Sequence, residues 1–232
     1  DIKLIGNVQL TIHFHSLMAF IHVFLFVYAI GGDVAVHYIG KYITRSELSL
    51  EERLRVRDLR FIVDMSARSA LVLLLAVGFT LAQAYGSPVT GIWLALLWVA
   101  DLAWLALVWL VYFNKGTPKG ARLQSLDMGI RYFVIASMLA FGSYCLITGE
   151  LIASNWLALK IVLFAAILGN GVWIRQIAAR WQAAFDLVLS GGDDRIRGEK
   201  MILEINGTAN RAAFLIWLLV VLMAFLGEVK PF

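Results

Sequence analysis

Six long apolar runs, separated by polar segments, make up most of the chain. They cover roughly residues 16–39, 65–85, 90–113, 129–149, 154–175 and 210–228. Each run is close to the ~20 residues that a helix needs to cross the hydrocarbon core of a bilayer. None shows the alternation of a barrel strand. The pattern predicts an all-α polytopic membrane bundle of six transmembrane helices, with residues 1–232 forming one membrane domain.

Composition agrees with this fold class and excludes others. The 232 residues are 61% hydrophobic and 16% charged, whereas soluble domains average ~45–50% apolar residues. The net charge of +4 comes from basic residues between the runs, so the lipid bilayer is the expected partner and no nucleic acid is. A single cysteine, Cys145, excludes a disulfide framework.

The connections differ in charge and predict the topology. Lys and Arg gather in segments 40–62, 114–128 and 175–211, and they are absent from "AYGSPVTG" and "TGELIAS". Because basic loops stay on the cytoplasmic side, we expect a bacterial inner-membrane protein with both termini on the outer, periplasmic side.

Three helical segments are expected outside the apolar runs. Ser49, followed three residues later by Glu52, matches a capping box and predicts a surface helix over about 48–62. Amphipathic spacing continues the fifth helix over about 176–190, as far as a glycine pair. The first helix is expected to extend outward to about residue 8.

Two short motifs recur at one spacing. "DMSAR" at 64–68 returns as "DMGIR" at 127–131, and "WLAL" at 93–96 returns at 156–159, both 63 residues later. Two coincidences at one offset predict an internal parallel repeat, in which spans 2–3 and spans 4–5 are copies. The second "WLAL" is followed by Lys160, whereas the first is followed by Leu97.

Ionisable residues inside spans are costly in lipid and therefore mark candidate functional positions. His22 lies 19 residues before Lys41, and Lys160 lies 15 residues before Arg175. At 1.5 Å per residue these depths are ~28 Å and ~22 Å, so His22 and Lys160 are expected to face one site. Asp101 lies near the depth of Lys160, which suggests an ion pair between them, functional or merely charge-neutralising.

The other ionisable positions have structural interpretations beside functional ones. His13 and His15 suit the outer headgroup zone, and His37 suits a structural position near the opposite interface. Asp33 is expected to form an ion pair with Arg68 or Arg131. All four histidines of the chain lie on its first helical segment. One straight helix cannot supply both axial ligands of a haem iron, so a haem here needs His22 with a different ligand or none, or a second subunit.

With these residues noted, the chain resembles the HemJ-type membrane protoporphyrinogen IX oxidases, within a wider group that includes CopD-like membrane proteins. Four stretches carry the resemblance, and in this reading spans 2–3 are an inserted helix pair. They are "IHVFLFVYAIGG" at 21–32, "MGIRYFVIASMLAFGSYCL" at 128–146, "NWLALKIVLF" at 155–164 and "RGEKMILEINGTANRAAFLIWLLVVLMAFLGEVKPF" at 197–232.

The resemblance implies a haem b site. His22 matches the family's histidine and would ligate the metal, Lys160 matches its lysine, and Arg131 and Asn210 lie in the matching stretches as further cofactor-binding candidates. Two positions differ from the family pattern. Asn210 is followed by Arg211 without a proline, and the fifth span has no late histidine.

Two function hypotheses follow. The first is a haem b-binding membrane oxidoreductase that oxidises protoporphyrinogen or a quinol-like reductant entering from lipid, with Lys160 and Asp101 as candidate catalytic residues. The second is a non-catalytic subunit of a larger membrane electron-transfer complex, or a CopD-like metal-handling protein. A homo-oligomer is compatible with either hypothesis.

Overall fold

A computed structural model describes residues 2–3, 9–10 and 13–231, and within them the expected all-α class is confirmed. The helices are α1 Phe14–Ile43, α2 Leu50–Ala82, the short 3-10 turn η1 Gln83–Tyr85, α3 Gly91–Phe113, α4 Pro118–Thr148, α5 Asn155–Ala179, α6 Trp181–Ser190 and α7 Gly192–Val229. Two two-residue strands, β1 Ile2–Lys3 and β2 Gln9–Leu10, pair in antiparallel fashion.

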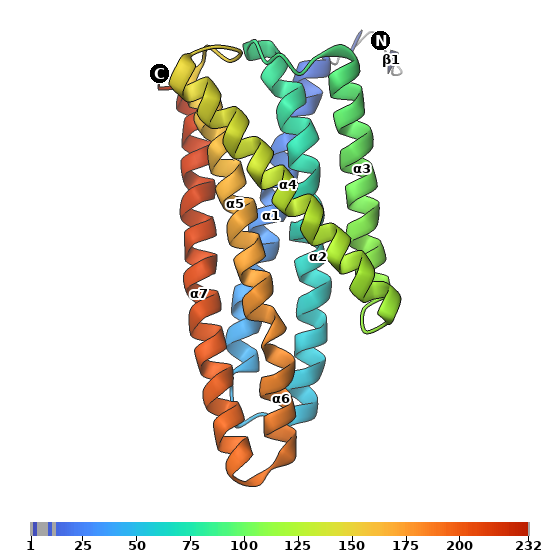
Figure 1. Cartoon of the computed structure of the whole chain (residues 1–232), viewed down its shortest axis with the longest axis vertical. Helices are drawn as coiled ribbons and strands as arrows, with labels where there is room; N and C mark the ends of the chain where they lie inside the picture. Colours follow the sequence, from blue (N-terminus) through green and yellow to red (C-terminus); the bar gives the residue numbers. More distant parts are fainter. Residues whose placement is uncertain (1, 4–8, 11–12, 232) are drawn as a thin grey trace.

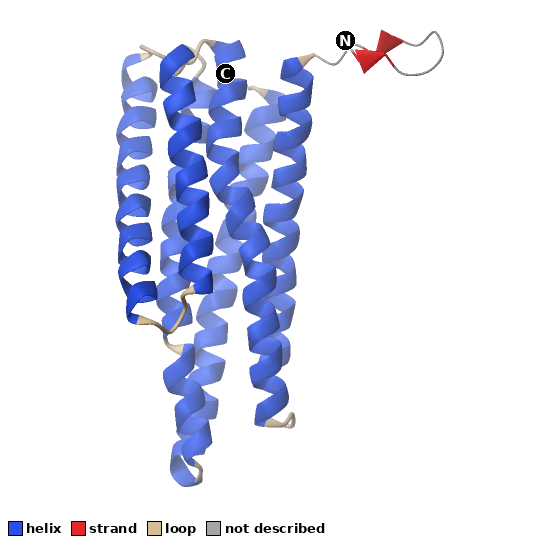
Figure 2. Ribbon diagram, turned by 90° about the vertical axis from the view of Figure 1, so that its right-hand side faces the viewer, coloured by secondary structure: helices blue, strands red, loops and turns tan. Residues whose placement is uncertain are grey.

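The long helices form one elongated bundle (Figure 1). Six helices of the described chain are long and apolar enough to cross a membrane, with α5 and α6 counted together. Helix α1 begins and α7 ends at the same end of the bundle, which we call the terminal end (Figures 1 and 2). The opposite end carries the α1–α2, α3–α4 and α6–α7 connections and is called the basic end.

Several helices continue beyond the apolar runs. The Ser49 hydroxyl accepts a hydrogen bond from the Glu52 amide at 3.2 Å and caps α2. No proline interrupts residues 50–82, so the separate surface helix expected over 48–62 is instead the first part of α2. Helix α7 likewise begins at Gly192, well before the apolar run at 210–228.

The amphipathic segment ends at the glycine pair as predicted, whereas the predicted start of the first helix is wrong. A turn at Arg180 separates α5 from α6, and α6 ends before Gly191, whose φ of 77° suits glycine. The prediction that the first helix extends outward to about residue 8 is wrong. Helix α1 begins at Phe14, and Gln9–Leu10 belong to β2. Residues 8, 11 and 12 lie outside the described residues.

The packing order places α4 between α3 and α5. Helix α1 packs along α2, α2 along α3, α3 along α4, α4 along α5, and α5 along α7. Figure 1 shows α3 at one edge of the bundle and α4 crossing obliquely in front of α5. Side chains on α3 are therefore kept away from those on α5.

One arginine joins the helices at the basic end. The Arg53 side chain is 2% exposed. Its guanidinium donates to both carboxylate oxygens of Glu199 on α7 at 2.6 and 2.9 Å, and to the Ile43 carbonyl at the end of α1 at 2.8 Å. It also lies over the ring of Phe185 on α6. A planar guanidinium with five donors can bind all these partners at once.

Large apolar side chains cover the outside of the bundle. Exposed examples occur on every membrane-length helix: Phe20, Ile62, Val99, Phe133, Trp173 and Phe225. An exposed apolar surface of this extent suits contact with lipid tails, and the membrane-protein class is supported by the six apolar helices.

Candidate ligand-binding site

A cavity of about 580 Å³ lies near the terminal end, lined mainly by α1, α2, α5 and α7. We call it the terminal-end cavity. Its volume is in the range of small-molecule and cofactor sites. Most lining side chains are apolar, and those that carry a titratable group are His15, His22, Tyr85, Lys160, Glu228 and Lys230. An apolar pocket with a few converging polar groups is the usual form of a ligand site.

His22 faces this cavity from the first half of α1. Its Nδ1 atom is buried and has no hydrogen-bond partner in the described part of the chain. A buried polar atom without a partner is uncommon in folded proteins and calls for an explanation. An absent ligand is one such explanation, since neutral imidazole is a frequent metal ligand.

Lys160 reaches the same cavity from α5, as the depth argument predicted. Among the described residues it forms no ion pair with a carboxylate. Its Nζ lies against the backbone of α7, only 2.5 Å from where a Cβ of Gly227 would stand. Glycine at position 227 therefore leaves the space that the amine occupies.

An aromatic pair and a second lysine close the cavity toward the terminal end. The rings of Tyr85 and Trp156 meet edge to face, with centroids 5.0 Å apart. The Nζ of Lys230 lies 4.9 Å from the Tyr85 centroid and 6.0 Å from that of Trp156. Interaction with the Tyr85 hydroxyl raises the pKa of Lys230, so this lysine is charged at neutral pH.

A second, smaller cavity of about 120 Å³ lies toward the basic end, and we call it the arginine cavity. It is lined by Arg57, Arg60, Arg68, Arg131 and Arg175, together with Asp33 and Asp64. The two cavities adjoin, because they share the apolar lining residues Ala29, Leu71, Ile167 and Val220.

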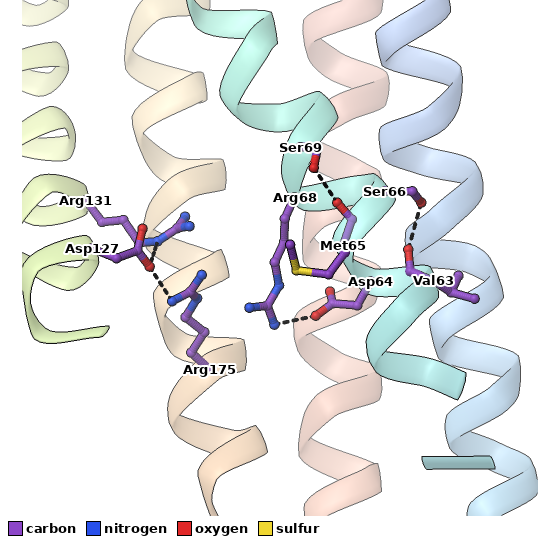
Figure 3. A network of polar contacts seen from close by, with 9 residues as sticks. All are labelled: Val63, Asp64, Met65, Ser66, Arg68, Ser69, Asp127, Arg131 and Arg175. Atoms are coloured by element: carbon purple, nitrogen blue, oxygen red, sulfur yellow. Dashed lines mark hydrogen bonds and ion pairs between the residues drawn. The ribbon is translucent and has the colours of Figure 1, made fainter. Parts of the chain in front are cut away.

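Asp127 is the centre of a network beside the arginine cavity (Figure 3). Its fully buried carboxylate accepts hydrogen bonds from Trp104 Nε1 on α3 at 2.9 Å, Arg131 Nε on α4 at 3.1 Å and Arg175 Nη1 on α5 at 2.6 Å. One carboxylate therefore links three helices and holds two guanidinium groups.

The first copy of the repeated motif, "DMSAR" at 64–68, forms a simpler Asp–Arg ion pair than the second copy does. Asp64 and Arg68 pair within α2 at the i and i+4 positions, as Asp127 and Arg131 do within α4 (Figure 3). The Asp64 side chain is 25% exposed, whereas that of Asp127 is 0% exposed. The proposed duplication itself stays a prediction.

The expected ion pair between Asp101 and Lys160 is wrong. Asp101 is 2% exposed on α3, and neither carboxylate oxygen has a partner among the described residues. Helix α4 packs against both α3, which carries Asp101, and α5, which carries Lys160. Lys160 lines the terminal-end cavity, whereas Asp101 does not.

The expected ion pair of Asp33 is also absent. Its carboxylate accepts a hydrogen bond from Trp217 Nε1 on α7 at 2.7 Å, and neither Arg68 nor Arg131 lies within 4.0 Å of it. His37 is buried one turn further along, with its ring 5.2 Å from that of Trp217. That packing agrees with a structural role for His37.

Of the remaining candidate residues, two line one of the cavities and two line neither. His15 lines the terminal-end cavity, whereas His13 is exposed at the start of α1 and lines neither cavity. Arg131 lines the arginine cavity instead of the one that holds His22 and Lys160. Asn210 is half-buried on α7 and lines neither cavity.

Some site residues were not singled out from the sequence. Tyr85, Trp156, Gly227 and Lys230 line the terminal-end cavity, and the sequence did not mark any of them as a candidate site residue. The nearest signal was the closing "GEVKPF" of the last matched stretch, which brings Lys230 to the end of α7.

No group of three or more metal-binding side chains occurs in the described part of the chain. Comparison with known protein families, curated proteins and solved structures finds no match for this chain.

Proposed function

We propose that the terminal-end cavity binds haem b or a closely related porphyrin, and that the protein is a membrane oxidoreductase of the HemJ-like kind. The observation that carries the proposal is the pairing of an unpartnered buried imidazole, His22, with an unpaired lysine, Lys160, at one 580 Å³ apolar cavity. An imidazole and a cation are the two groups that a porphyrin with iron and propionates requires.

The side chains that line the cavity include groups that could hold a haem iron. His22 would hold the iron from α1, and His15 is on the same helix and so cannot take the opposite position. The other lining groups able to bind iron are the thioethers of Met138 on α4 and Met223 on α7, and the Lys160 amine. Histidine combined with methionine is an established haem ligand set.

The cations and aromatic rings fit the rest of a porphyrin. Lys160 and Lys230 both line the cavity and would bind propionates as compact charges. Tyr85 and Trp156 would pack on the edge of the ring. Haem, when bound, supplies one-electron chemistry. Lys160 is also placed to take up or release a proton beside the bound molecule.

The cavity is reachable from lipid. Val23 on α1 and Ala224 on α7 both line it and are exposed on the outside of the bundle. An apolar reductant dissolved in the bilayer, such as a porphyrinogen or a quinol, would enter between these helices without crossing water.

An absorption spectrum tests the proposal directly. The protein is purified in a neutral detergent and its spectrum is recorded before and after addition of haemin and of dithionite. We expect a Soret band, present on purification or formed in one-to-one titration, that shifts on reduction. A folded protein that binds no haem would contradict the proposal. Bound haem without turnover of protoporphyrinogen or quinol would favour the electron-transfer subunit instead of the enzyme.

Gly227→Ala should weaken porphyrin binding without unfolding the protein. The new Cβ would stand 2.5 Å from Lys160 Nζ, and the flexible lysine would move away at little cost to packing. We expect an affinity several-fold lower in fluorescence titrations with protoporphyrin IX. Gly169→Ala on α5 is the matched control, since a Cβ there meets nothing within 4 Å. Equal affinities for all three proteins would show that the amine takes no part in binding.

We also propose the orientation. The arginine-rich basic end would face the cytoplasm of a bacterial cell and the terminal end the periplasm, which agrees with the positive-inside rule. The porphyrin site would then lie in the outer half of the inner membrane. Labelling of a cysteine introduced at the exposed residue Glu150, between α4 and α5, with an impermeant maleimide on whole cells should succeed. Labelling only after lysis would reverse the orientation.

A further inference from the structure

The arginine cavity has one guanidinium group more than the carboxylates around it. Five arginines line it, and the carboxylates around them belong to Asp33, Asp58, Asp64 and Asp127. Asp58 pairs with Arg57 and Asp64 with Arg68, while Asp127 serves both Arg131 and Arg175. Asp33 is held by Trp217.

Two guanidinium groups are left with free donors. Arg60 forms no ion pair or hydrogen bond among the described residues and lies over the ring of Trp181, 5.6 Å from its centroid. Arg131 is 7% exposed, and its Nη2 is buried without a partner. A buried charged donor without an acceptor, such as Nη2 of Arg131, is costly, whereas Arg60 is half-buried, so the cavity favours an additional acceptor.

The donors come from several sides of the cavity. Arg60 and Arg68 extend from α2, Arg131 from α4 and Arg175 from α5. Figure 3 shows Arg68 directed toward Asp64 on its own helix and Arg175 directed toward Asp127 on α4. A phosphate group offers more acceptor oxygens than a carboxylate to donors on different helices, and guanidinium geometry matches phosphate oxygens well.

We propose that the arginine cavity is a binding site for a phosphate group, with Arg60 and Arg131 as its principal donors. The cavity volume of about 120 Å³ is roughly tenfold the space that one water requires, which is enough for a phosphate. Its lining reaches Arg57 and Trp181 at the basic end, where both free phosphate and the headgroups of anionic lipids are accessible. The site is independent of the porphyrin proposal, because it lies outside the terminal-end cavity.

Thermal unfolding in detergent tests the site with inorganic phosphate as the probe. Phosphate is titrated against gluconate at constant ionic strength and neutral pH, without haem. We expect a saturable rise in Tm of about 3–5 °C at ten times the dissociation constant. Arg60→Gln should remove the rise while keeping the fold, since Arg60 takes part in no ion pair. Arg131→Gln should also remove it. Arg55→Gln, an exposed arginine on the same helix, should keep it.

A second arm identifies the source of the phosphate group. The protein is placed in nanodiscs of phosphatidylcholine with or without phosphatidylglycerol, and retained lipid is measured by native mass spectrometry. Phosphatidylglycerol retained by the wild type and lost in Arg60→Gln would identify a lipid headgroup as the ligand. Phosphate stabilisation without lipid retention would identify a free anion. Absence of both effects, or effects of equal size in Arg60→Gln, would overturn the proposal.

Discussion

Asp127→Asn should destabilise the bundle by about 3–5 kcal/mol, the cost of removing one partner from a buried ion pair. The carboxylate is fully buried and accepts from Trp104, Arg131 and Arg175. Asparagine has nearly the same shape but no charge, so two buried guanidinium groups would lose their counter-ion. The measurement is unfolding by sodium dodecyl sulfate in mixed micelles, followed by circular dichroism.

Asp64→Asn is the matched control for this prediction. It changes the corresponding residue of the "DMSAR" motif, but among the described residues Asp64 pairs only with Arg68, and it is partly exposed. We expect a loss of about 1 kcal/mol or less, the range for exposed pairs. Adding Arg131→Gln to the Asp127→Asn protein should recover part of the loss, because it removes one uncompensated charge. Equal losses at positions 64 and 127, or no recovery, would contradict the role of Asp127 as the shared carboxylate.

The sequence predicted well how deep His22 and Lys160 lie along their helices, but it predicted poorly which helices are neighbours. Counting residues from basic anchors placed His22 and Lys160 at similar depths, and both line one cavity. The same count paired Asp101 with Lys160, which is wrong because α4 separates α3 from α5. Depth follows from the constant rise of a helix. Which helices are neighbours depends on the packing of whole surfaces, which no single residue reveals.

Helix ends were missed for a related reason. Hydropathy marks where a chain can leave lipid, but a helix ends only where its backbone bonding is interrupted. Helices α2 and α7 therefore continue into the polar segments and bring Arg53 to Glu199. Asp127 was noticed only as part of a repeated motif, because it precedes the apolar run at 129–149. The four-residue spacing between Asp127 and Arg131 nevertheless indicated an ion pair, since residues i and i+4 lie next to each other on a helix.

His22→Ala and Lys160→Leu should affect porphyrin binding in different ways. Alanine at position 22 removes the imidazole that would hold the iron, so the Soret shift on haem addition should be lost. Metal-free protoporphyrin IX has no iron for this imidazole, and its binding should remain. Lys160→Leu should weaken both ligands by about ten- to a hundredfold, the equivalent of the 1.5–3 kcal/mol that a hydrogen bond to a charged group contributes.

The variants keep the fold for reasons visible in the chain. Leucine already follows "WLAL" at position 97 of α3, so a leucine at position 160 suits the same helical context, and His22 has no hydrogen-bond partner to lose at Nδ1. His13→Ala and Lys119→Leu, both exposed and outside the two cavities, are the controls and should titrate like the wild type. Absorbance and fluorescence titrations measure the two ligands separately. Loss of both ligands in His22→Ala would mean that His22 shapes the cavity instead of holding iron, and unchanged binding in Lys160→Leu would remove the lysine from the site.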